Sequence, residues 1–569
     1  MYEELIREIA PKPDFNLKWY NNEDSYSEGE IEDRIVRLIA QNEPEEYVQA
    51  IADHYCWSVF YHLTHIRRNI LNWYPFSGEA SVLEIGCGMG ALTGMLCDRC
   101  RDVTAVELSQ RRATATLLRC RKKENLEIIV GNLNDIQFEK KYDYITLIGV
   151  LEYQGNYTDG TDPYRDFLKK IKTLLKPDGK LLIAIENQYG LKYWCGAGED
   201  HTGIPFEGIN QYTLSGGKCR TFSRKGLERL IRDSGFAHVF FYYPMPDYKL
   251  PTVIYSQGQL PKNENMMDMQ YYYIPNAFTL VAQEKNIYKD IIDNHVFEFF
   301  ANSFLVECSD SEQLGEVTFA KLSSQRLEQY QVGTAFTKEK EVIKFHLQGE
   351  KGVPHLNQIL QNERELLERG INVWSDVRKE NVLISGRSEA KTLEEVLLEE
   401  YGSGNTEQIL KIYDDLYMDI LKSSEAVSWE ENLLYTLDPG MKPDREKYGV
   451  ILEKGYPDMI PRNAFWMQGE ICWFDQEWIL EHVPAKYILY RAIALLYISF
   501  PQLDRILSVG TLFDKYGLRD AMREFQQMEE LFYGAILDQL HCVEYKKIAG
   551  DAKDACVESI RRLLAYDGK

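Results

Sequence analysis

A run of glycines after a short apolar segment is the part of this sequence best suited to chemistry. Residues 81–85 read as a strand, and Gly86, Gly88 and Gly90 follow before a helix that begins at about residue 92. Glycines at such a bend let the backbone approach a nucleotide where a Cβ would collide. Glu107 ends the next apolar run, and a carboxylate there can accept both hydroxyls of an adenosine ribose. The pattern predicts a nucleotide site.

Glycine spacing alone also fits a dinucleotide site, but two details favour S-adenosylmethionine (SAM). Glu84 precedes the first glycine by two residues, where a carboxylate could receive the cationic methionyl end. Residues 142–153 then read as a fourth strand, and residues 174–183 as a turn into a fifth. This ordered set resembles class I SAM-dependent methyltransferases over about residues 80–285. The resemblance implies a Rossmann-like α/β fold with SAM as the cofactor.

The resemblance also implies a role for each matched residue. The residues expected to line the methionine portion are Glu84, Gly86, Gly88 and Gly90. Glu107 is expected to hold the ribose. Asn132 stands where the family often has an acid that contacts the adenine amine, and asparagine can still form a hydrogen bond there.

An insert after the fifth strand is expected to shape the acceptor side. It runs from about residue 186 to 203 and is rich in glycine, aromatic and ionisable residues. Loops at the carboxyl ends of strands in open α/β sheets commonly carry function. His201, beside Asp200, is a candidate general base for an acceptor hydroxyl, because imidazole titrates near neutrality. A purely structural role for this histidine stays open.

The second half of the chain carries another set of polar residues. Residues 317–322, 331–336 and 341–347 read as three successive strands, followed by a helix with apolar residues at 3.6-residue spacing. Glu363 falls inside the apolar stripe of that helix, where an unpaired carboxylate would be costly. Lys344 on the preceding strand is its expected partner.

Three further residues in this half follow the spacing of a kinase catalytic centre. They are Asp458, Asn463 and Asp475. Residues 315–569 resemble aminoglycoside-phosphotransferase-like kinases, mainly through the segment Phe-Asp-Gln-Glu-Trp at 474–478. The resemblance implies that Asp458 orients an acceptor hydroxyl and that Asn463 and Asp475 hold Mg²⁺, a hard ion that prefers oxygen ligands. Lys344, paired with Glu363, would grip the phosphates of ATP.

Two departures leave phosphotransfer open. The loop at residues 323–326 lacks the glycines that would let a backbone cover ATP, and Pro457 stands where the kinases have histidine or glycine. We expect a kinase-like fold, with ATP and Mg²⁺ as cofactors only if the site is active.

Length and charge set the remaining expectations. A chain of 569 residues exceeds what one core usually serves, and we expect a helical segment at residues 1–79, a methyltransferase domain at 80–285 and a bilobal α+β domain at 286–569, its lobes meeting at about residue 400. An aromatic run at residues 55–63 covers the cofactor or shapes the acceptor pocket, or alternatively packs on the sheet. The net charge of −23 argues against nucleic acid as a partner. No signal peptide or transmembrane segment is visible, and a cytoplasmic location is expected.

The two halves together resemble bacterial bifunctional enzymes that cap a growing surface polysaccharide. This implies O- or phosphate-methylation of a glycan or glycolipid end, with a phosphorylation step before it and glycosyltransferases of the assembly system as partners. Two alternatives stay open. One is a methyltransferase for a small metabolite whose kinase-like domain is an inactive binding or regulatory module. The other is a scaffold with two degenerate nucleotide sites.

Overall fold

The computed structural model describes residues 13–22, 29–262, 279–442, 444–541 and 552–565, together with 6, 269, 271, 272 and 543. The chain forms two compact units. Unit 1 contains residues 1–324, 335–338 and 539–569, and unit 2 contains residues 325–334 and 339–538. Strand β11 (Val332–Thr337) contributes residues to both. Within the described residues, no helix is both long enough and apolar enough to cross a membrane.

Unit 1 is built on a sheet whose first six strands run parallel. Their order in the sheet is β1-β4-β3-β2-β5-β6. The strands are β1 (Asp14–Trp19), β2 (Ser81–Ile85), β3 (Asp102–Glu107), β4 (Leu126–Gly131), β5 (Tyr142–Ile148) and β6 (Leu175–Glu186). The chain order reverses between β2, which neighbours β3, and β5. Such a switch point is where open α/β sheets bind ligands, outside the carboxyl ends of the strands.

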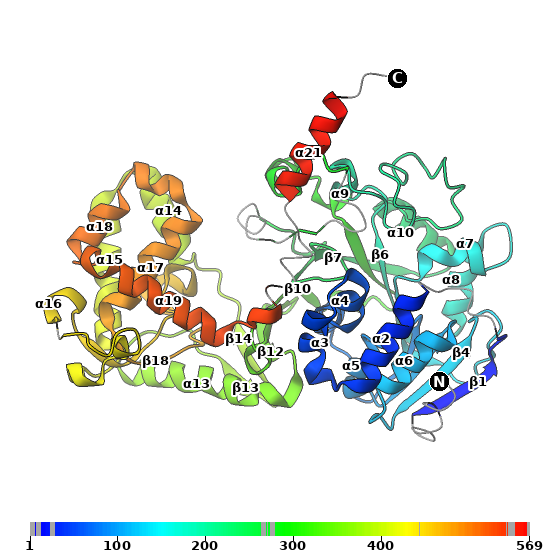
Figure 1. The fold of residues 1–569 in the computed structure, drawn as a ribbon, viewed down its shortest axis with the longest axis horizontal. Helices are drawn as coiled ribbons and strands as arrows, with labels where there is room; N and C mark the ends of the chain where they lie inside the picture. Colours follow the sequence, from blue (N-terminus) through cyan, green and yellow to red (C-terminus); the bar gives the residue numbers. More distant parts are fainter. Residues whose placement is uncertain are drawn as a thin grey trace. The chain divides into compact units, whose positions relative to one another are not determined.

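Helices follow most of these strands, as expected for parallel pairing (Figure 1). Helix α5 (Thr93–Arg99) leads from β2 to β3, α6 (Gln110–Arg119) from β3 to β4, and α7 (Gln154–Tyr157) and α8 (Pro163–Thr173) from β5 to β6. Helices α9 (Leu191–Trp194) and α10 (Arg224–Asp233) follow β6, and β4 leads to β5 without a helix. The central strand β2 is buried at every position, which fits a parallel strand covered on both faces.

The N-terminal segment is mostly helical, as predicted, but it also supplies strand β1. Its helices are α2 (Glu30–Gln41), α3 (Tyr47–Asp53) and α4 (Trp57–Leu63). The fully buried Glu32 of α2 pairs with Arg112 of α6 at 2.6 Å. A buried pair of this kind fixes α2 against α6 (Gln110–Arg119), the helix that follows β3.

The sheet continues with antiparallel strands that correct the predicted domain boundary. They are β9 (Ser303–Ser309), β7 (His238–Met245), β8 (Val253–Ser256) and β10 (Val317–Leu322), in that order beyond β6. The boundary predicted at 285/286 therefore lies within unit 1. The apolar run at residues 277–282 forms no strand over residues 279–282, and residues 277 and 278 lie outside the described residues. Ser303–Ser309 takes the place beside β6, where all of its residues are buried.

Unit 1 also contains helices α11 (Tyr288–Asp293), α12 (Phe297–Phe300) and α21 (Ala552–Leu564). The last of these comes from the end of the chain, which the sequence assigned to the second domain. Its Cys556 thiol donates a hydrogen bond to the carbonyl of Ala282. The chain end therefore belongs to the first unit.

Unit 2 combines a sheet with a mainly helical part that also contains two short strand pairs. Its sheet elements are β12 (Glu341–His346), β13 (Val377–Lys379) and β14 (Val382–Gly386), and the pairs β15 (Ile451–Gly455) with β18 (Leu480–Pro484) and β16 (Ala464–Met467) with β17 (Glu470–Trp473). Its helices are α13 (Val353–Glu368), α14 (Leu393–Ser403), α15 (Thr406–Lys422), α16 (Arg445–Tyr448), α17 (Ala485–Ser499), α18 (Val509–Lys515) and α19 (Met522–Ile536). A separate apolar core built on α14, α15 and α17 holds it together (Figure 1).

Candidate functional site

A cavity of about 290 Å³ lies at the carboxyl ends of β2, β3, β5 and β6 in unit 1. One part of its lining comes from the residues expected to bind the cofactor, namely Gly86, Gly88, Glu107 and Asn132. Another part comes from later segments of the chain, namely Glu152, Glu186, Asp200, His201, Tyr248 and Lys249. The fold thus brings the predicted nucleotide site and the predicted insert to one cavity.

The glycine turn fits the close approach that the sequence predicts. Gly86 has φ +72°, and a Cβ there would lie 2.5 Å from a methyl carbon of Val150. Gly88 has φ +57° and borders the cavity with no atom within 4 Å of where its Cβ would be. The turn therefore leaves an open cradle beside exposed backbone, which suits the methionine portion of SAM.

Glu107 is held at the end of β3 by backbone donors. Its Oε2 accepts the N–H of Gly88 at 2.8 Å, and its Oε1 accepts the N–H of Ser109 at 3.1 Å. Burial raises the pKa of this carboxyl. Each oxygen keeps capacity for another donor, as a ribose diol requires. Asn132 also borders the cavity, and its Oδ1 accepts the N–H of Asn134 at 2.9 Å.

Two residues predicted to line the cofactor site do not border the cavity. Glu84 is buried under the turn, where its Oε2 accepts the hydroxyl of Thr93 at 2.6 Å. Burial raises the pKa of Glu84 to about 7. A Cβ at Gly90, with φ +74°, would lie 3.0 Å from the Cα of Thr116. Both residues support the glycine turn from the protein interior. A contact of either residue with the methionyl end of SAM stays a prediction.

The aromatic run before β2 contributes to the cavity and to packing. Trp57 and Tyr61 border the cavity and stack with ring centroids 5.2 Å apart. The guanidinium of Arg67 lies over the ring of Tyr61 at 3.9 Å. Val59 and Phe60, between the two aromatic residues, are fully buried. Helix α4 thus places Trp57 and Tyr61 at the cavity and Phe60 in an apolar core, and covering of the cofactor by this run stays a prediction.

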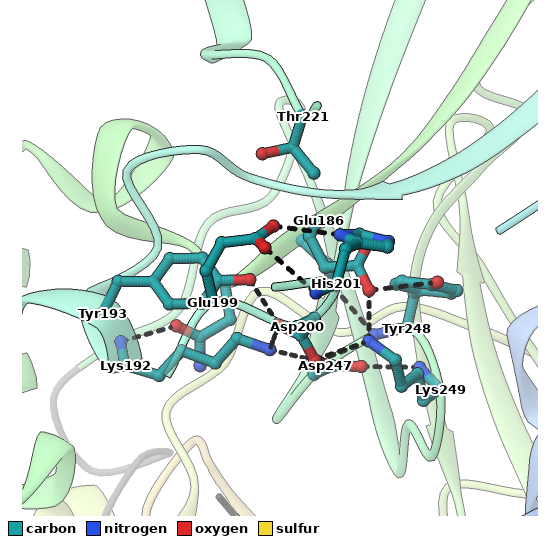
Figure 2. Close-up of polar contacts among 12 residues, drawn as sticks. Glu186, Lys192, Tyr193, Glu199, Asp200, His201, Thr221, Asp247, Tyr248 and Lys249 are labelled. Atoms are coloured by element: carbon teal, nitrogen blue, oxygen red, sulfur yellow. Dashed lines mark hydrogen bonds and ion pairs between the residues drawn. The ribbon is translucent and has the colours of Figure 1, made fainter. Parts of the chain in front are cut away.

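On the other side of the cavity, carboxylates surround His201. Its Nδ1 lies 2.9 Å from Oε1 of Glu199, and its Nε2 lies 3.6 Å from Oε1 of Glu152 and 3.9 Å from Oε2 of Glu186. Figure 2 shows Glu186, Glu199 and His201 turned toward one another. Glu186 ends β6, and Glu152 lies in the turn η3 (Leu151–Tyr153) that follows β5.

The charges of the neighbouring carboxylates determine the protonation state of His201. Burial alone would lower the pKa of the imidazole, but Glu186, Glu152 and Glu199 together raise that pKa well above its usual value. A protonated imidazole donates hydrogen bonds and does not accept a proton. The general-base role predicted for His201 stays a prediction, and the carboxylates beside it become further candidates.

A network of lysines and aspartates supports the side of the cavity that carries His201 (Figure 2). Lys192 pairs with Asp200 and Asp247 at 2.8 Å each. Lys249 pairs with Glu186 and, at 3.1 Å, with Asp200. Asp200 also accepts the hydroxyl of Tyr193. The pKa of Asp200 is lowered because the attraction of the two lysines exceeds the effect of burial. The insert is thereby locked to strand β6 and to the segment after β7.

Unit 2 gathers several of its predicted residues. Lys344 pairs with Asp376 at 2.8 Å and with Asp475 at 3.0 Å. Glu363, its expected partner, instead accepts the backbone N–H of Asp376 at 2.9 Å. Burial and the charge of Asp376 raise the pKa of Glu363 to about 7. The predicted link between Lys344 and Glu363 therefore runs through Asp376.

Asp458 and Asn463 lie in one hydrogen-bonded loop. The amide of Asn463 donates to the carbonyl oxygen of Asp458 at 3.3 Å, and the N–H of Glu477 donates to Oδ2 of Asp458 at 3.0 Å. Burial and the charge of Glu477 raise the pKa of Asp458 to about 7.

Asp475 has φ +57°, so its backbone takes a conformation uncommon for a residue with a side chain.

Sequence reasoning did not single out five residues of these two sites. They are Glu152, Glu186, Glu199, Lys249 and Asp376. For Glu152 and Glu186 a signal existed, because each follows or ends a predicted parallel strand whose carboxyl end meets the others at one edge of the sheet. Lys249 and Asp376 carried no such signal.

Comparison with known proteins points to the same part of the chain as the cavity. The family described as "Methyltransferase domain" matches residues 25–239. An uncharacterized methyltransferase of Staphylococcus carnosus (strain TM300) is 36% identical over 115 residues, which cover 20% of this chain and 51% of that protein. A malonyl-(acyl-carrier protein) O-methyltransferase of Priestia megaterium is 29% identical over 127 residues, which cover 21% of this chain and 42% of that protein. The N-terminal part of the chain thus contains a class I SAM-dependent methyltransferase domain.

Among solved structures, phosphoethanolamine N-methyltransferase 2 of Haemonchus contortus in complex with SAM is 18% identical with a TM-score of 0.27, covering 43% of this chain and 52% of that one. A TM-score of this size supports no further conclusion. The chain spans about half the length of the curated relatives named above.

Proposed function

We propose that unit 1 transfers a methyl group from SAM to a hydroxyl that enters the cavity beside Glu152 and Glu186. The observation that carries this proposal is a single cavity bordered by the glycine turn and Glu107 on one side and by these carboxylates on the other. A cofactor and an acceptor bound there would be adjacent.

The residues of the cavity would act mainly by alignment. SAM, when bound, supplies a methyl group on an already activated sulfonium, so positioning of the acceptor oxygen accounts for most of the acceleration. Glu107 would accept the ribose hydroxyls. Glu152 and Glu186, both buried, would accept hydrogen bonds from the acceptor, and Glu152 could take its proton.

The negative charge of Glu152 and Glu186 favours a hydroxyl over a phosphate as the acceptor. Each of Glu152 and Glu186 has a buried oxygen without a hydrogen-bond partner, and such oxygens attract donors and repel anions. Together with the two-part architecture, this supports a sugar hydroxyl at a glycan or glycolipid end. A hydroxylated small metabolite is the second candidate, because the cavity of about 290 Å³ would also hold one.

The methyltransferase proposal predicts that Glu107→Ala loses cofactor binding. Removal of the carboxylate removes the acceptors for the ribose, and we expect the affinity for S-adenosylhomocysteine to fall at least about 100-fold, since hydrogen bonds to a charged group contribute about 1.5–3 kcal/mol each. Isothermal titration calorimetry measures this. Glu127→Gln, on the neighbouring strand and away from the cavity, is the control. Equal affinity in Glu107→Ala and the native protein would contradict the proposal.

We propose further that unit 2 is a kinase-like module with a Mg²⁺-nucleotide centre. Support comes from Lys344 held between Asp376 and Asp475, and from the nearby pairing of Asp458 with Asn463. Lys344 would contact phosphates, and the oxygens of Asn463 and Asp475 would bind the metal. An inactive module that only binds a ligand is the alternative.

The kinase-like proposal predicts Mg²⁺-dependent binding of ATP. We expect calorimetry to detect binding to the native protein with Mg²⁺, little binding with EDTA, and at least a tenfold loss in Asp475→Ala, because the metal loses an anionic ligand. Asp438→Ala, an exposed position in the same unit, should bind normally. Absence of ATP binding to the native protein would leave unit 2 as a module for another ligand.

A further inference from the structure

Three side chains in the cavity of unit 1 converge on one point. Nε2 of His201 and one carboxylate oxygen each from Glu152 and Glu186 lie within 4.8 Å of one another. All three side chains are at least nine-tenths buried, with exposed fractions of 6% for His201 and 1% for each glutamate. They border the same cavity as the glycine turn.

Their separations suit a shared cation better than direct hydrogen bonds. Nε2 lies 3.6 Å from Oε1 of Glu152 and 3.9 Å from Oε2 of Glu186, both beyond hydrogen-bond range. Ligand atoms held about 2.1 Å from a divalent ion lie roughly 3 to 4 Å from one another. The carboxylates favour a proton on Nε2 while no metal ion is bound. That proton would not bridge these atoms well, whereas a metal ion that displaces it would.

A second observation is independent of the clustering. Oε2 of Glu186 and Oε2 of Glu152 are buried and have no hydrogen-bond partner. Buried carboxylate oxygens are normally paired, because leaving them without a partner is costly. The Oε2 of Glu186 is the atom that faces His201. An unpaired oxygen of Glu186 at this point indicates a missing positive ligand, and Glu152 meets the same point through its Oε1.

The surroundings of the three ligands also fit a metal centre. Glu199 lies 2.9 Å from Nδ1 of His201 and accepts the backbone N–H groups of residues 201 and 202. A carboxylate on the far nitrogen is the usual partner of a metal-binding histidine, because it fixes the tautomer that frees Nε2. The other oxygen of Glu186 accepts the hydroxyl of Tyr248 at 3.2 Å and pairs with Lys249. Both outer contacts orient ligands toward the shared point.

We infer that Glu152, Glu186 and His201 bind a divalent metal ion of the Mn²⁺ to Zn²⁺ group in the acceptor side of the cavity. One imidazole nitrogen with two carboxylate oxygens suits these ions, and coordination positions stay open for water or an acceptor hydroxyl.

The role of the ion, though not its binding, rests on the proposed methyl transfer. With Glu152 engaged as a ligand and no longer the base, a coordinated hydroxyl would ionise more easily, and its proton would leave to solvent water through the cavity. The hydroxyl oxygen then forms a bond to the methyl carbon while the sulfur–carbon bond breaks and its electron pair stays on sulfur. The products are a methyl ether, S-adenosylhomocysteine and one released proton. No oxidant or reductant is needed.

Metal binding is tested with Mn²⁺ on the full chain carrying Asp475→Ala, which removes the metal ligand proposed in unit 2. After treatment with EDTA and desalting, the electron paramagnetic resonance signal of free Mn²⁺ reports binding during a titration. We expect one Mn²⁺ per chain, at least tenfold weaker binding in Glu186→Gln and in Glu152→Gln, and unchanged binding in Glu298→Gln. Glu298 is a matched control because it pairs with Arg224 and does not border the cavity.

Binding of S-adenosylhomocysteine to the same variants separates the two proposals. Retained cofactor binding with lost Mn²⁺ binding supports the metal site and shows that the variants are folded. Failure of the parent protein to bind Mn²⁺ or Zn²⁺ would overturn the metal site and leave methyl transfer standing. Equal Mn²⁺ affinity in the parent protein and Glu186→Gln would also overturn it. Loss of cofactor binding in Glu107→Ala is expected whether or not the metal site exists.

Discussion

Glu84 shows how one residue can match a motif and yet do something else. It lies two residues before the first glycine, as the motif requires, but its carboxyl turns inward and accepts the hydroxyl of Thr93. Only 4% of the residue is exposed, and burial raises the pKa of its carboxyl to about 7. The residue therefore acts first on the stability of the turn.

The raised pKa of Glu84 predicts a pH-dependent stability. A carboxyl whose folded pKa is about 7, against an ordinary value of 4.5, stabilises the fold fully below about pH 4.5, and that contribution disappears as the pH rises through 7. The loss is on the order of 3 kcal/mol. Glu84→Gln keeps an acceptor for Thr93 but cannot ionise.

Urea unfolding between about pH 5 and about pH 8 measures this effect. Relative to Glu84→Gln, we expect the free energy of unfolding of the native protein to fall across the range. Parallel pH profiles of the two proteins would contradict the assignment of this titration to Glu84.

At the site, the sequence predicted the cofactor side better than the acceptor side. Gly86, Gly88 and Glu107 belong to one short motif whose spacing fixes their geometry, and all three border the cavity. Glu152 and Lys249 come from separate segments, each without a motif. Their approach to His201 depends on how the segments after β5 and β7 pack, which spacing along the chain does not specify.

At the scale of elements, strand β9 (Ser303–Ser309) is the largest difference from expectation. Its register pairs Glu307 with Leu182 of β6 and with Phe240 of β7. All seven of its residues are buried, although Ser303, Glu307 and Ser309 are polar. The sequence therefore carries only a short apolar signal at residues 304–306, and the strand lies far along the chain from β6.

The position of β9 predicts that a cavity there destabilises unit 1. Phe304 is fully buried and meets Phe241 edge to face at 5.5 Å. Phe304→Ala should lower the free energy of unfolding by about 3–5 kcal/mol. Leu214→Ala, which is 75% exposed in the same unit, should change it by less than about 0.5 kcal/mol.

Differential scanning calorimetry with S-adenosylhomocysteine identifies the transition of unit 1 as the one that the ligand raises. We expect Phe304→Ala to lower that transition and to leave the other unchanged. A shift confined to the other transition would mean that β9 belongs to unit 2.

At the scale of the whole molecule, the chain does not divide at one point. Residues 539–569 return to unit 1, where His541 packs 4.8 Å from His65. Composition gave no warning of this return, because the chain has no low-complexity linker and both units are mixed α and β. A domain boundary predicted from motifs marks only where the last motif ends. Strands and helices from later parts of the chain can still belong to the same domain.

The sequence by itself determined the nucleotide turn, the acid at the end of β3 and the parallel strands that carry them. These features are local: residue type and spacing specify the turn, and alternation of strands and helices specifies parallel pairing. Only the tertiary structure decided which carboxylates face His201, that Asp376 stands between Lys344 and Glu363, and where β9 inserts. Those arrangements depend on contacts between segments far apart in the chain, and the energy of such contacts comes from packing and charge pairing that no single segment contains.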